Sequence, residues 1–269
     1  MTAHYLSLSV PIKFLTNNKH ENMMIIELIH MYLRTQIRSL VSFSKGLSKE
    51  LTRSIREKDL DFPEMFEDYE KYHTNINTGK TVRYQLIKDW ILPNSTILDV
   101  GVGDGHMAEL LMKNKNALVT GMDISNIACQ KAKDRGISVI VRDINNGINL
   151  DPEQHYDYIL LVEVIEHTIY PQKILMESIS HAKKGVIVTI PNSAYIKWRI
   201  QLMRGYSPRQ SFSHLHFWSI KDFYLFCKKL NIEIIDFKTL LPQLLLRYRN
   251  LLAWQQCWLI APKSSNNKM

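Results

Sequence analysis

The chain has 269 residues, of which 45% are hydrophobic and 22% charged, and it carries a formal net charge of +8 at neutral pH. This length allows one or two domains with a sizeable core, and no run of about 18 residues lacks charge, so a membrane-spanning helix is not expected. The three cysteines, Cys129, Cys227 and Cys257, are too widely spaced to support a disulfide framework or a cysteine zinc site.

Residues 1–60 are predicted to form an extension, disordered over 1–22 and then built of basic amphipathic helices. Apolar residues recur at helical spacing in two stripes, Ile25, Ile29, Leu33, Ile37 and Leu40, then Leu47, Leu51 and Ile55. Basic side chains such as Arg34 and Arg38 lie beside the first stripe. Such helices cap the main domain, dock a protein partner, or lie on an anionic membrane. We favour the cap or the partner.

The main domain, 61–269, is organised around the stretch 95–121. A short apolar run at 97–100 precedes Gly101, Gly103 and Gly105, and apolar residues at helical spacing follow. This order predicts a buried strand, a tight turn and a helix. The Gly-x-Gly-x-Gly spacing is not the Gly-x-Gly-x-x-Gly of dinucleotide-binding turns, which argues against NAD. A plain strand-to-helix turn is the alternative interpretation.

Acidic residues lie at or near the ends of four consecutive predicted strands. Asp99 is in the first strand, and Asp123, Asp143 and Glu163 come at or after the ends of runs at 117–122, 138–141 and 156–162. In an open parallel sheet, the carboxyl edge is where ligands bind. We therefore expect one acidic edge that receives a ligand.

With these motifs, the chain resembles the class I S-adenosylmethionine-dependent methyltransferases over roughly 89–238. The resemblance implies that Asp99, Gly101, Gly103 and Gly105 hold the methionine end of this cofactor. It also implies that Asp123, with Ile124 after it, meets the ribose, that Asp143 meets the adenine amine, and that Ile144 lies against the ring. Glu163 completes the implied cofactor-binding set.

The remaining pattern fits the same fold. After a helix from Pro171, strands are predicted at 185–191, 232–237 and 251–260, with a helix at 219–230 capped by Ser219. An insertion at 193–218 separates the core motifs, 95–192, from the C-terminal helix and strands, 219–262. The expected fold is α/β, a seven-stranded Rossmann-like methyltransferase sheet with its last strand antiparallel, helices on both faces and an N-terminal helical extension.

Glu163, Glu166 and His167 are spaced so that a helical turn would point all three to one side. His167 is the candidate general base, with Glu166 as its catalytic partner, because the reference pKa of histidine suits proton transfer near neutral pH. A histidine that merely packs near the cofactor is the alternative. With His214 or His216 from the insertion, these residues also form a candidate site for Mg²⁺, Mn²⁺ or Zn²⁺. The Glu-x-x-Glu-His pattern is similar to that of ubiquinone-biosynthesis O-methyltransferases and small-RNA methyltransferases.

A second resemblance, to the MetW proteins of methionine biosynthesis, covers the C-terminal half. It is carried by Pro191, Asn192, Trp198, Arg199, Gln201, Leu202, Arg204, Gly205, Pro208, His216, the run from Ile220 to Phe223, and Cys227. That family shares the methyltransferase fold and is linked to homoserine O-acyltransferase. Because of Glu163, Glu166 and His167 and the long basic N-terminal segment, we expect a relative of MetW rather than a plain member.

The sequence thus predicts a methyltransferase that uses S-adenosylmethionine to methylate a small molecule, at oxygen. The alternative is a MetW-like binding protein that contacts an acyltransferase. RNA methylation is a third interpretation, prompted by the positive charge but without a nucleic-acid-binding motif. The cysteine usage and the lack of a secretory signal pattern predict a cytoplasmic protein.

Overall fold

The computed structural model describes residues 27, 31, 33–45, 80–206 and 213–262. The chain divides into two compact units, one with residues up to 53 and Pro242–Leu244, the other with the rest. In the first unit, residues 33–45 are helical, as the first stripe predicted. The second stripe, Leu47, Leu51 and Ile55, lies outside the described residues, as does the segment 1–22.

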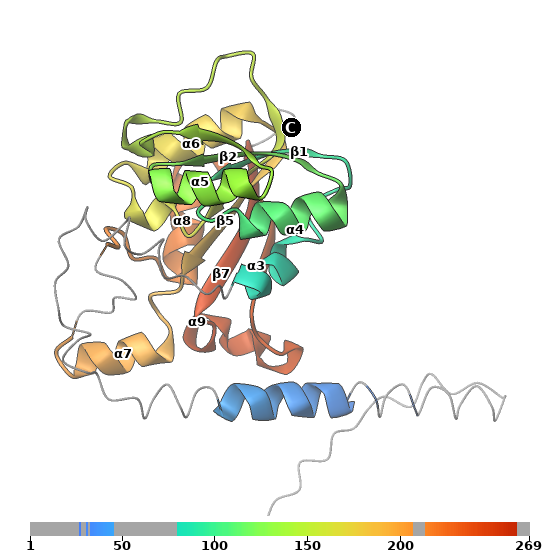
Figure 1. The fold of residues 1–269 in the computed structure, drawn as a ribbon. Helices are drawn as coiled ribbons and strands as arrows, with labels where there is room; N and C mark the ends of the chain where they lie inside the picture. Colours follow the sequence, from blue (N-terminus) through green and yellow to red (C-terminus); the bar gives the residue numbers. More distant parts are fainter. Residues whose placement is uncertain (1–26, 28–30, 32, 46–79, 207–212, 263–269) are drawn as a thin grey trace, which may run out of the picture. The chain divides into compact units, whose positions relative to one another are not determined.

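The second unit is built on a seven-stranded sheet with the order β3-β2-β1-β4-β5-β7-β6 (Figure 1). The strands are β1 (Thr96–Val100), β2 (Leu118–Asp123), β3 (Ser138–Val141), β4 (Tyr156–Val162), β5 (Ala182–Pro191), β6 (Ile232–Thr239) and β7 (Gln255–Pro262). Strands β3, β2, β1, β4 and β5 are parallel, and β7 runs antiparallel to both of its neighbours. This confirms the expected sheet with its last strand antiparallel.

Helices follow most of the strands, as in a doubly wound fold. The α-helices of this unit are α3 (Lys80–Ile87), α4 (His106–Lys115), α5 (Asn126–Asp134), α6 (Pro171–His181), α7 (Ile196–Met203), α8 (Ile220–Lys229) and α9 (Arg249–Leu252). Short 3-10 helices are η2 (Ile144–Asn146), η3 (Ile165–His167) and η4 (Gln243–Tyr248). Ser219 caps α8 through a reciprocal pair of hydrogen bonds with Asp222, which confirms the predicted cap.

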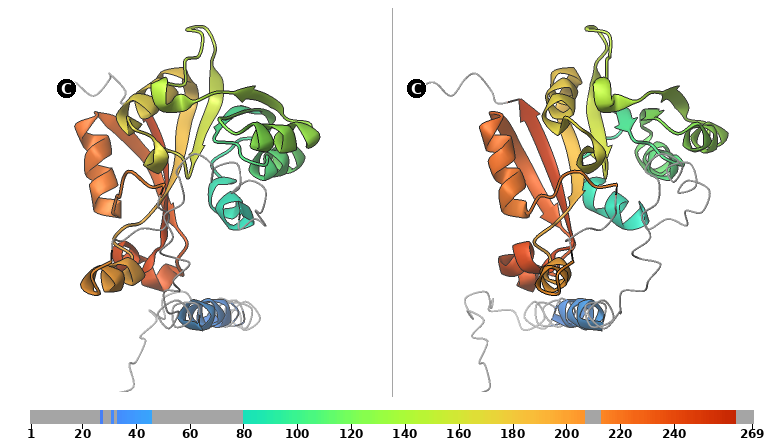
Figure 2. Two further views of the ribbon diagram at one scale, coloured as in Figure 1. Left: turned by 60° about the vertical axis from the view of Figure 1, so that its left-hand side comes forward. Right: turned by 90° about the vertical axis from the view of Figure 1, so that its left-hand side faces the viewer.

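Two apolar clusters form the core, one on each face of the sheet. Alternating residues of β1 divide between them, since Ile97 belongs to one cluster and Leu98 to the other. Helices α6 and α8 cover the face of Leu98, and α3 and α4 cover the face of Ile97. Figure 2 shows α8, in orange, and α3, in teal, on opposite sides of the strands. Helices therefore cover both faces, as expected.

The structure corrects three predicted segments. Strand β5 begins at Ala182 rather than 185, and β7 begins at Gln255 rather than 251, because residues 249–252 form α9. A short apolar run does not distinguish a helical turn from a strand, which explains the second error. The insertion at 193–218, for which no element was predicted, contains α7. Among the described residues, no helix has both the length and the hydrophobicity needed to cross a bilayer.

Candidate cofactor and acceptor site

The turn between β1 and α4 depends on glycine. Gly101, Gly103 and Gly105 all have positive φ angles, of 73°, 56° and 77°. A Cβ at Gly101 would collide with the Val164 side chain, and one at Gly105 would lie 2.6 Å from Ile137 Cδ1. Residues with a side chain are therefore excluded by both backbone conformation and space. Gly101 and Gly105 are required by the close packing of the turn against Val164 and Ile137.

Asp123, the last residue of β2, binds this turn directly. Its Oδ2 accepts a hydrogen bond of 2.9 Å from the Gly103 N–H, and its Oδ1 accepts one of 2.9 Å from the Ser125 N–H. The side chain is 6% exposed. A carboxylate has about four acceptor positions, so these two bonds leave capacity for hydroxyl groups. Asp123 faces the glycine turn, where the resemblance expects a ribose, and its ribose role stays a prediction.

The other expected cofactor residues lie along the same carboxyl edge. Asp99 is buried in β1. Asp143 follows β3, is exposed, and accepts hydrogen bonds from the backbone and side-chain amides of Asn145. Ile144 is half-buried against the core, and Ile124 is 40% exposed just after β2. Their contacts with a cofactor stay predictions.

Glu163, just beyond β4, is held in place by three hydrogen-bonding partners. Its backbone is left-handed, with a φ of 57°. Its Oε1 accepts hydrogen bonds from the Thr189 hydroxyl, at 3.1 Å, and the Gln255 amide, at 2.6 Å, and its Oε2 pairs with Arg83 at 3.1 Å. Because these three donors bind the Glu163 carboxylate, it contributes to holding the fold together. Neither Arg83 nor Gln255 belonged to a sequence motif, so the pattern alone did not reveal them.

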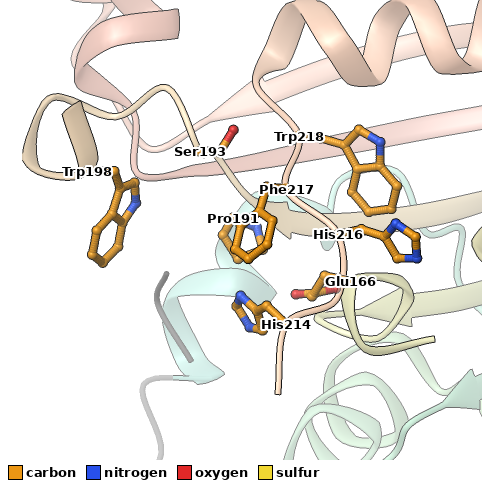
Figure 3. A pocket seen from close by; sticks show the side chains of 8 residues that line it. All are labelled: Glu166, Pro191, Ser193, Trp198, His214, His216, Phe217 and Trp218. Atoms are coloured by element: carbon orange, nitrogen blue, oxygen red, sulfur yellow. The ribbon is translucent and has the colours of Figure 1, made fainter. Parts of the chain in front are cut away.

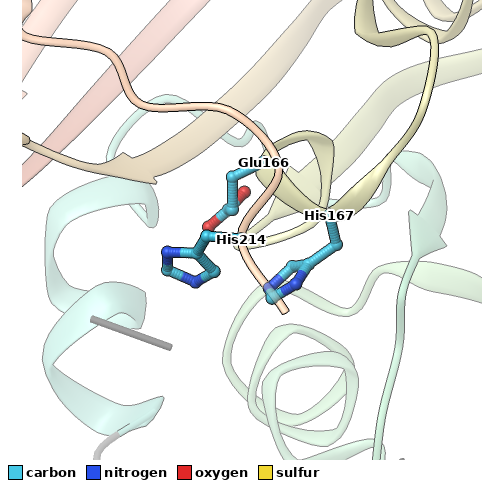
Figure 4. Close-up of side chains that lie close together, drawn as sticks. All are labelled: Glu166, His167 and His214. Carbon is cyan, nitrogen blue, oxygen red and sulfur yellow. The ribbon is translucent and has the colours of Figure 1, made fainter. Parts of the chain in front are cut away.

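Glu166, His167 and His214 come together as a compact cluster (Figure 4). One ligand atom from each lies within 4.8 Å of the other two. The imidazole rings of His167 and His214 are 4.6 Å apart, edge to face. Of the four residues expected to share a metal, the structure gathers these three and not Glu163. The expectation that a helical turn would bring Glu163 to the same side as Glu166 and His167 is wrong, because its carboxylate is drawn to Arg83 and Gln255.

Hydrogen bonds to backbone groups hold His214 beside Glu166 and His167, which precede it by 48 and 47 positions. The Glu166 carbonyl accepts the N–H groups of Leu215 and His216, at 2.8 and 3.1 Å. His167 Nδ1 lies 3.1 Å from the Ser213 carbonyl oxygen. Because a carbonyl can only accept, Nδ1 carries the proton and the lone pair of His167 is on Nε2. His216, the alternative ligand, turns its Nε2 to the Thr168 carbonyl instead.

Burial shifts the pKa values of all three side chains in the cluster. The Glu166 side chain is 1% exposed, and neither of its carboxylate oxygens has a hydrogen-bond partner among the described residues. Burial, reinforced by the nearby Glu163 carboxylate, raises the pKa of Glu166 well above its ordinary value. Burial lowers the pKa of His167, and burial with proximity to His167 lowers the pKa of His214 to about 3. Both imidazoles are therefore neutral at neutral pH.

A pocket opens beside the cluster (Figure 3). Its walls come from the end of β5, from α7 and from the segment before α8, and the lining residues are Glu166, Pro191, Ser193, Trp198, His214, His216, Phe217 and Trp218. Three of these are large aromatic side chains. The hollow has a volume of about 10 Å³, about the room of one water molecule, and its lining combines aromatic side chains with a buried carboxyl and a neutral imidazole.

The family model for the methionine biosynthesis protein MetW matches residues 82–259. The chain belongs to the MetW family. The matched segment of this MetW-family chain contains Glu163, Glu166 and His167. These residues therefore do not set the chain apart from the family, although the sequence analysis had expected a relative rather than a plain member. The basic extension lies outside the matched segment.

Curated relatives of this MetW-family chain are O-methyltransferases by name. It is 27% identical over 132 residues to the mitochondrial ubiquinone biosynthesis O-methyltransferase of Candida albicans, a match that covers 45% of this chain and 40% of that protein. It is 30% identical over 155 residues to the ubiquinone biosynthesis O-methyltransferase of Rickettsia bellii, covering 54% and 64%. The chain thus spans about half of the length of these relatives.

Solved structures show the fold of this MetW-family chain. The magnesium protoporphyrin IX methyltransferase of Synechocystis, solved with S-adenosylhomocysteine bound, superposes with a TM-score of 0.51 at 14% identity. The alignment covers 85% of this chain and 99% of that one. The chain therefore has the Rossmann-like fold of the class I methyltransferases, as predicted.

Proposed function

We propose that this chain is an S-adenosylmethionine-dependent methyltransferase that methylates a hydroxyl group of a small acceptor. The observation that carries the proposal is the buried Glu166 carboxyl, which lacks a hydrogen-bond partner among the described residues and lies beside two neutral imidazoles. An unpartnered buried carboxyl is costly, and such groups are retained where a ligand completes them. The relatives' names support oxygen as the accepting atom.

The cofactor half of the proposal depends on the glycine turn. The Asp123 carboxylate, the tight turn at Gly101 and the open carboxyl edge of the sheet suit a nucleoside with a short charged tail. S-adenosylmethionine, when bound, supplies an electrophilic methyl group on a positively charged sulfur. The protein then has to hold an acceptor oxygen in line with that methyl group.

The acceptor half depends on the pocket. Trp198, Phe217 and Trp218 provide aromatic surface, Glu166 with His214 provides polar groups, and the lining side chains move apart to admit an acceptor larger than water. A hydroxyl placed there can give its proton to Nε2 of His167, whose Nδ1–H is oriented by the Ser213 carbonyl. His214, with a pKa of about 3, stays neutral and serves to position the acceptor rather than to take its proton.

Calorimetric titration with S-adenosylhomocysteine tests the cofactor half, and a screen of hydroxylated acceptors, a ubiquinone precursor included, tests the acceptor half. We expect saturable binding of the nucleoside and methyl transfer that disappears in His167→Gln while binding is retained. An absence of binding to the purified chain would overturn the proposal.

The same cluster also fits a divalent cation. One carboxylate and two neutral imidazoles are a donor set for Zn²⁺ or Mn²⁺ more than for Mg²⁺, which prefers oxygen ligands. Glu166, His167 and His214 would hold the ion, which would lower the pKa of a bound hydroxyl. Titration of the metal-free chain with each ion, followed by thermal unfolding, should show stabilisation that Glu166→Gln removes. Stabilisation that survives this substitution would place the ion elsewhere.

The family match favours a second candidate, a MetW-like protein that binds an acyltransferase of methionine biosynthesis and regulates it. A regulator does not need the Glu166 and His167 side chains for chemistry. If Glu166→Gln and His167→Gln leave a regulatory effect on homoserine O-acyltransferase intact, and no acceptor is methylated, the second candidate replaces the first.

A further inference from the structure

The C-terminal end of α7 carries exposed apolar side chains. Leu202 is 60% exposed, Met203 79% and Tyr206 42%. Burying side chains of this size in a nonpolar environment is favourable, so a group of them at one helix end marks an interaction surface. Arg204, also exposed, lies among them. The described part of this segment, 193–206, contains Lys197, Arg199 and Arg204 and no acidic residue.

A second segment that combines exposed apolar or aromatic side chains with basic ones lies at the carboxyl edge of the sheet, as α7 does. Helix α7 follows the carboxyl end of β5, and α9 precedes the antiparallel strand β7, so the topology places both at the carboxyl edge (Figure 1). Tyr248 is 52% exposed there, between the exposed Arg247 and Arg249. The stretch 240–254 also lacks acidic residues.

The helix at 33–45, in the other unit, also combines exposed apolar side chains with basic ones. Leu33, Ile37 and Val41 are 42%, 58% and 46% exposed, and their spacing of four places them on one helix face. Arg34 and Arg38 each follow one of these residues, so they lie along the side of the apolar face. Cationic residues that border an apolar face are typical of helices that lie at a membrane surface.

We propose that the chain binds the surface of an anionic lipid membrane: the α7 end and the region around Tyr248 make one contact in the second unit, and the helix at 33–45 makes a contact of its own in the first unit. Charge complementarity supports this occupant, because the cations of these segments have no acidic neighbour in sequence over 31–45, 193–206 or 240–254. RNA would also attract the cations, but binding to phosphates does not require large exposed aliphatic side chains. Tyrosines and arginines beside apolar residues suit the boundary between headgroups and acyl chains. This inference does not depend on the proposed methyltransferase activity.

Vesicle flotation with the full chain tests the proposal. Vesicles of phosphatidylcholine alone are compared with vesicles that also contain phosphatidylserine, at low and at high salt. We expect binding to the anionic vesicles only, weakened by salt. The paired substitution Leu202→Glu with Met203→Glu, and separately Ile37→Glu with Val41→Glu, should each weaken binding by about tenfold or more. Arg204→Gln should weaken it by about fivefold.

Leu118→Glu is the matched control. Leu118 is 71% exposed, but as the first residue of β2 it lies at the amino end of the parallel strands, away from their carboxyl ends. Its substitution should therefore change vesicle binding by less than about twofold. All these side chains are exposed, and a melting curve for each variant verifies folding. An absence of binding to anionic vesicles at low salt overturns the proposal. Vesicle binding that is weakened by Arg204→Gln but not by the apolar substitutions also overturns the proposal. Binding to single-stranded RNA, measured in parallel, is expected to show that same pattern.

Discussion

The glycine turn and the Glu166 cluster lie at the same edge of one sheet but are built in opposite ways. The turn is local in sequence, and its key carboxylate, Asp123, has both oxygens hydrogen-bonded to the backbone. The cluster joins residues 46 or more positions apart, and its carboxyl, Glu166, has no hydrogen-bond partner among the described residues. The comparison contrasts a carboxylate that is hydrogen-bonded to the backbone with a buried carboxyl for which we propose a ligand. Substitutions at five positions, with comparison variants at two more, test it.

The largest effect is expected for Glu166→Gln. The amide keeps the shape of the side chain but removes its charge, so methyl transfer should fall by about a hundredfold to ten-thousandfold. Where the wild-type carboxyl is ionised, stability should rise, because the variant buries a neutral amide in place of a charged carboxylate. The pKa of Glu166 is raised on folding, so the unfolded state loses this proton first, and the wild type should lose stability relative to the variant as pH rises above 4.5.

Glu163→Gln is the matched comparison and should behave in the opposite way. It leaves Arg83 without its ion pair, so unfolding should become easier by about 1–3 kcal/mol. Activity and denaturation by urea are measured for both variants. Equal stability changes of the same sign would remove the distinction between the two carboxylates.

Gly101→Ala tests whether the turn tolerates a side chain. The new Cβ would collide with Val164 at a positive φ, and we expect a loss of about 2–4 kcal/mol in stability together with weaker binding of S-adenosylhomocysteine. Gly136 has a φ of 82° with open space around it, so Gly136→Ala measures the cost of the backbone conformation alone, about 1 kcal/mol. Similar losses in the two variants would mean that space at Gly101 is not limiting.

Asp123→Asn should have a smaller effect. The amide retains one acceptor oxygen, so either the Gly103 or the Ser125 N–H loses its partner, at a cost of about 1–2 kcal/mol. Binding of S-adenosylhomocysteine should weaken by about tenfold, which calorimetry measures. Asp143→Asn, at an exposed carboxylate that caps η2, should change stability by a few tenths of a kcal/mol only and shows whether Asp143 also contributes to binding.

The pH dependence of stability, measured with a chelator present, tests the burial of His214. Burial lowers the pKa of His214 to about 3, so the unfolded state binds a proton below pH 6.5 while the folded state does not. Stability is therefore lost as pH falls from 6.5 toward 3, by at most about 1.4 kcal/mol per pH unit. His214→Gln should flatten this dependence in urea denaturation at several pH values. An unchanged slope would show that His214 is not the group responsible.

Much of the fold was predictable because each strand is a short apolar run bounded by turns. The predicted bounds of β3 and β4 agree with the structure, and Ser219 caps α8 as expected. The start of β7 was misplaced because Leu251 and Leu252 suit a helical turn as well as a strand. The hydrogen-bond partners of Glu163 were not predictable, because Arg83 and Gln255 lie 80 and 92 positions away.

The sequence by itself determined the elements whose causes are local: the glycines that permit positive φ angles, the alternating apolar residues that face two cores, and the acidic residues near strand ends. Tertiary structure alone decided that Glu163 is paired with Arg83 while the buried Glu166 carboxyl has no hydrogen-bond partner among the described residues. That outcome depends on long-range hydrogen bonds, such as those from Leu215 and His216 to the Glu166 carbonyl, and on burial. Both arise only when segments distant in sequence pack together.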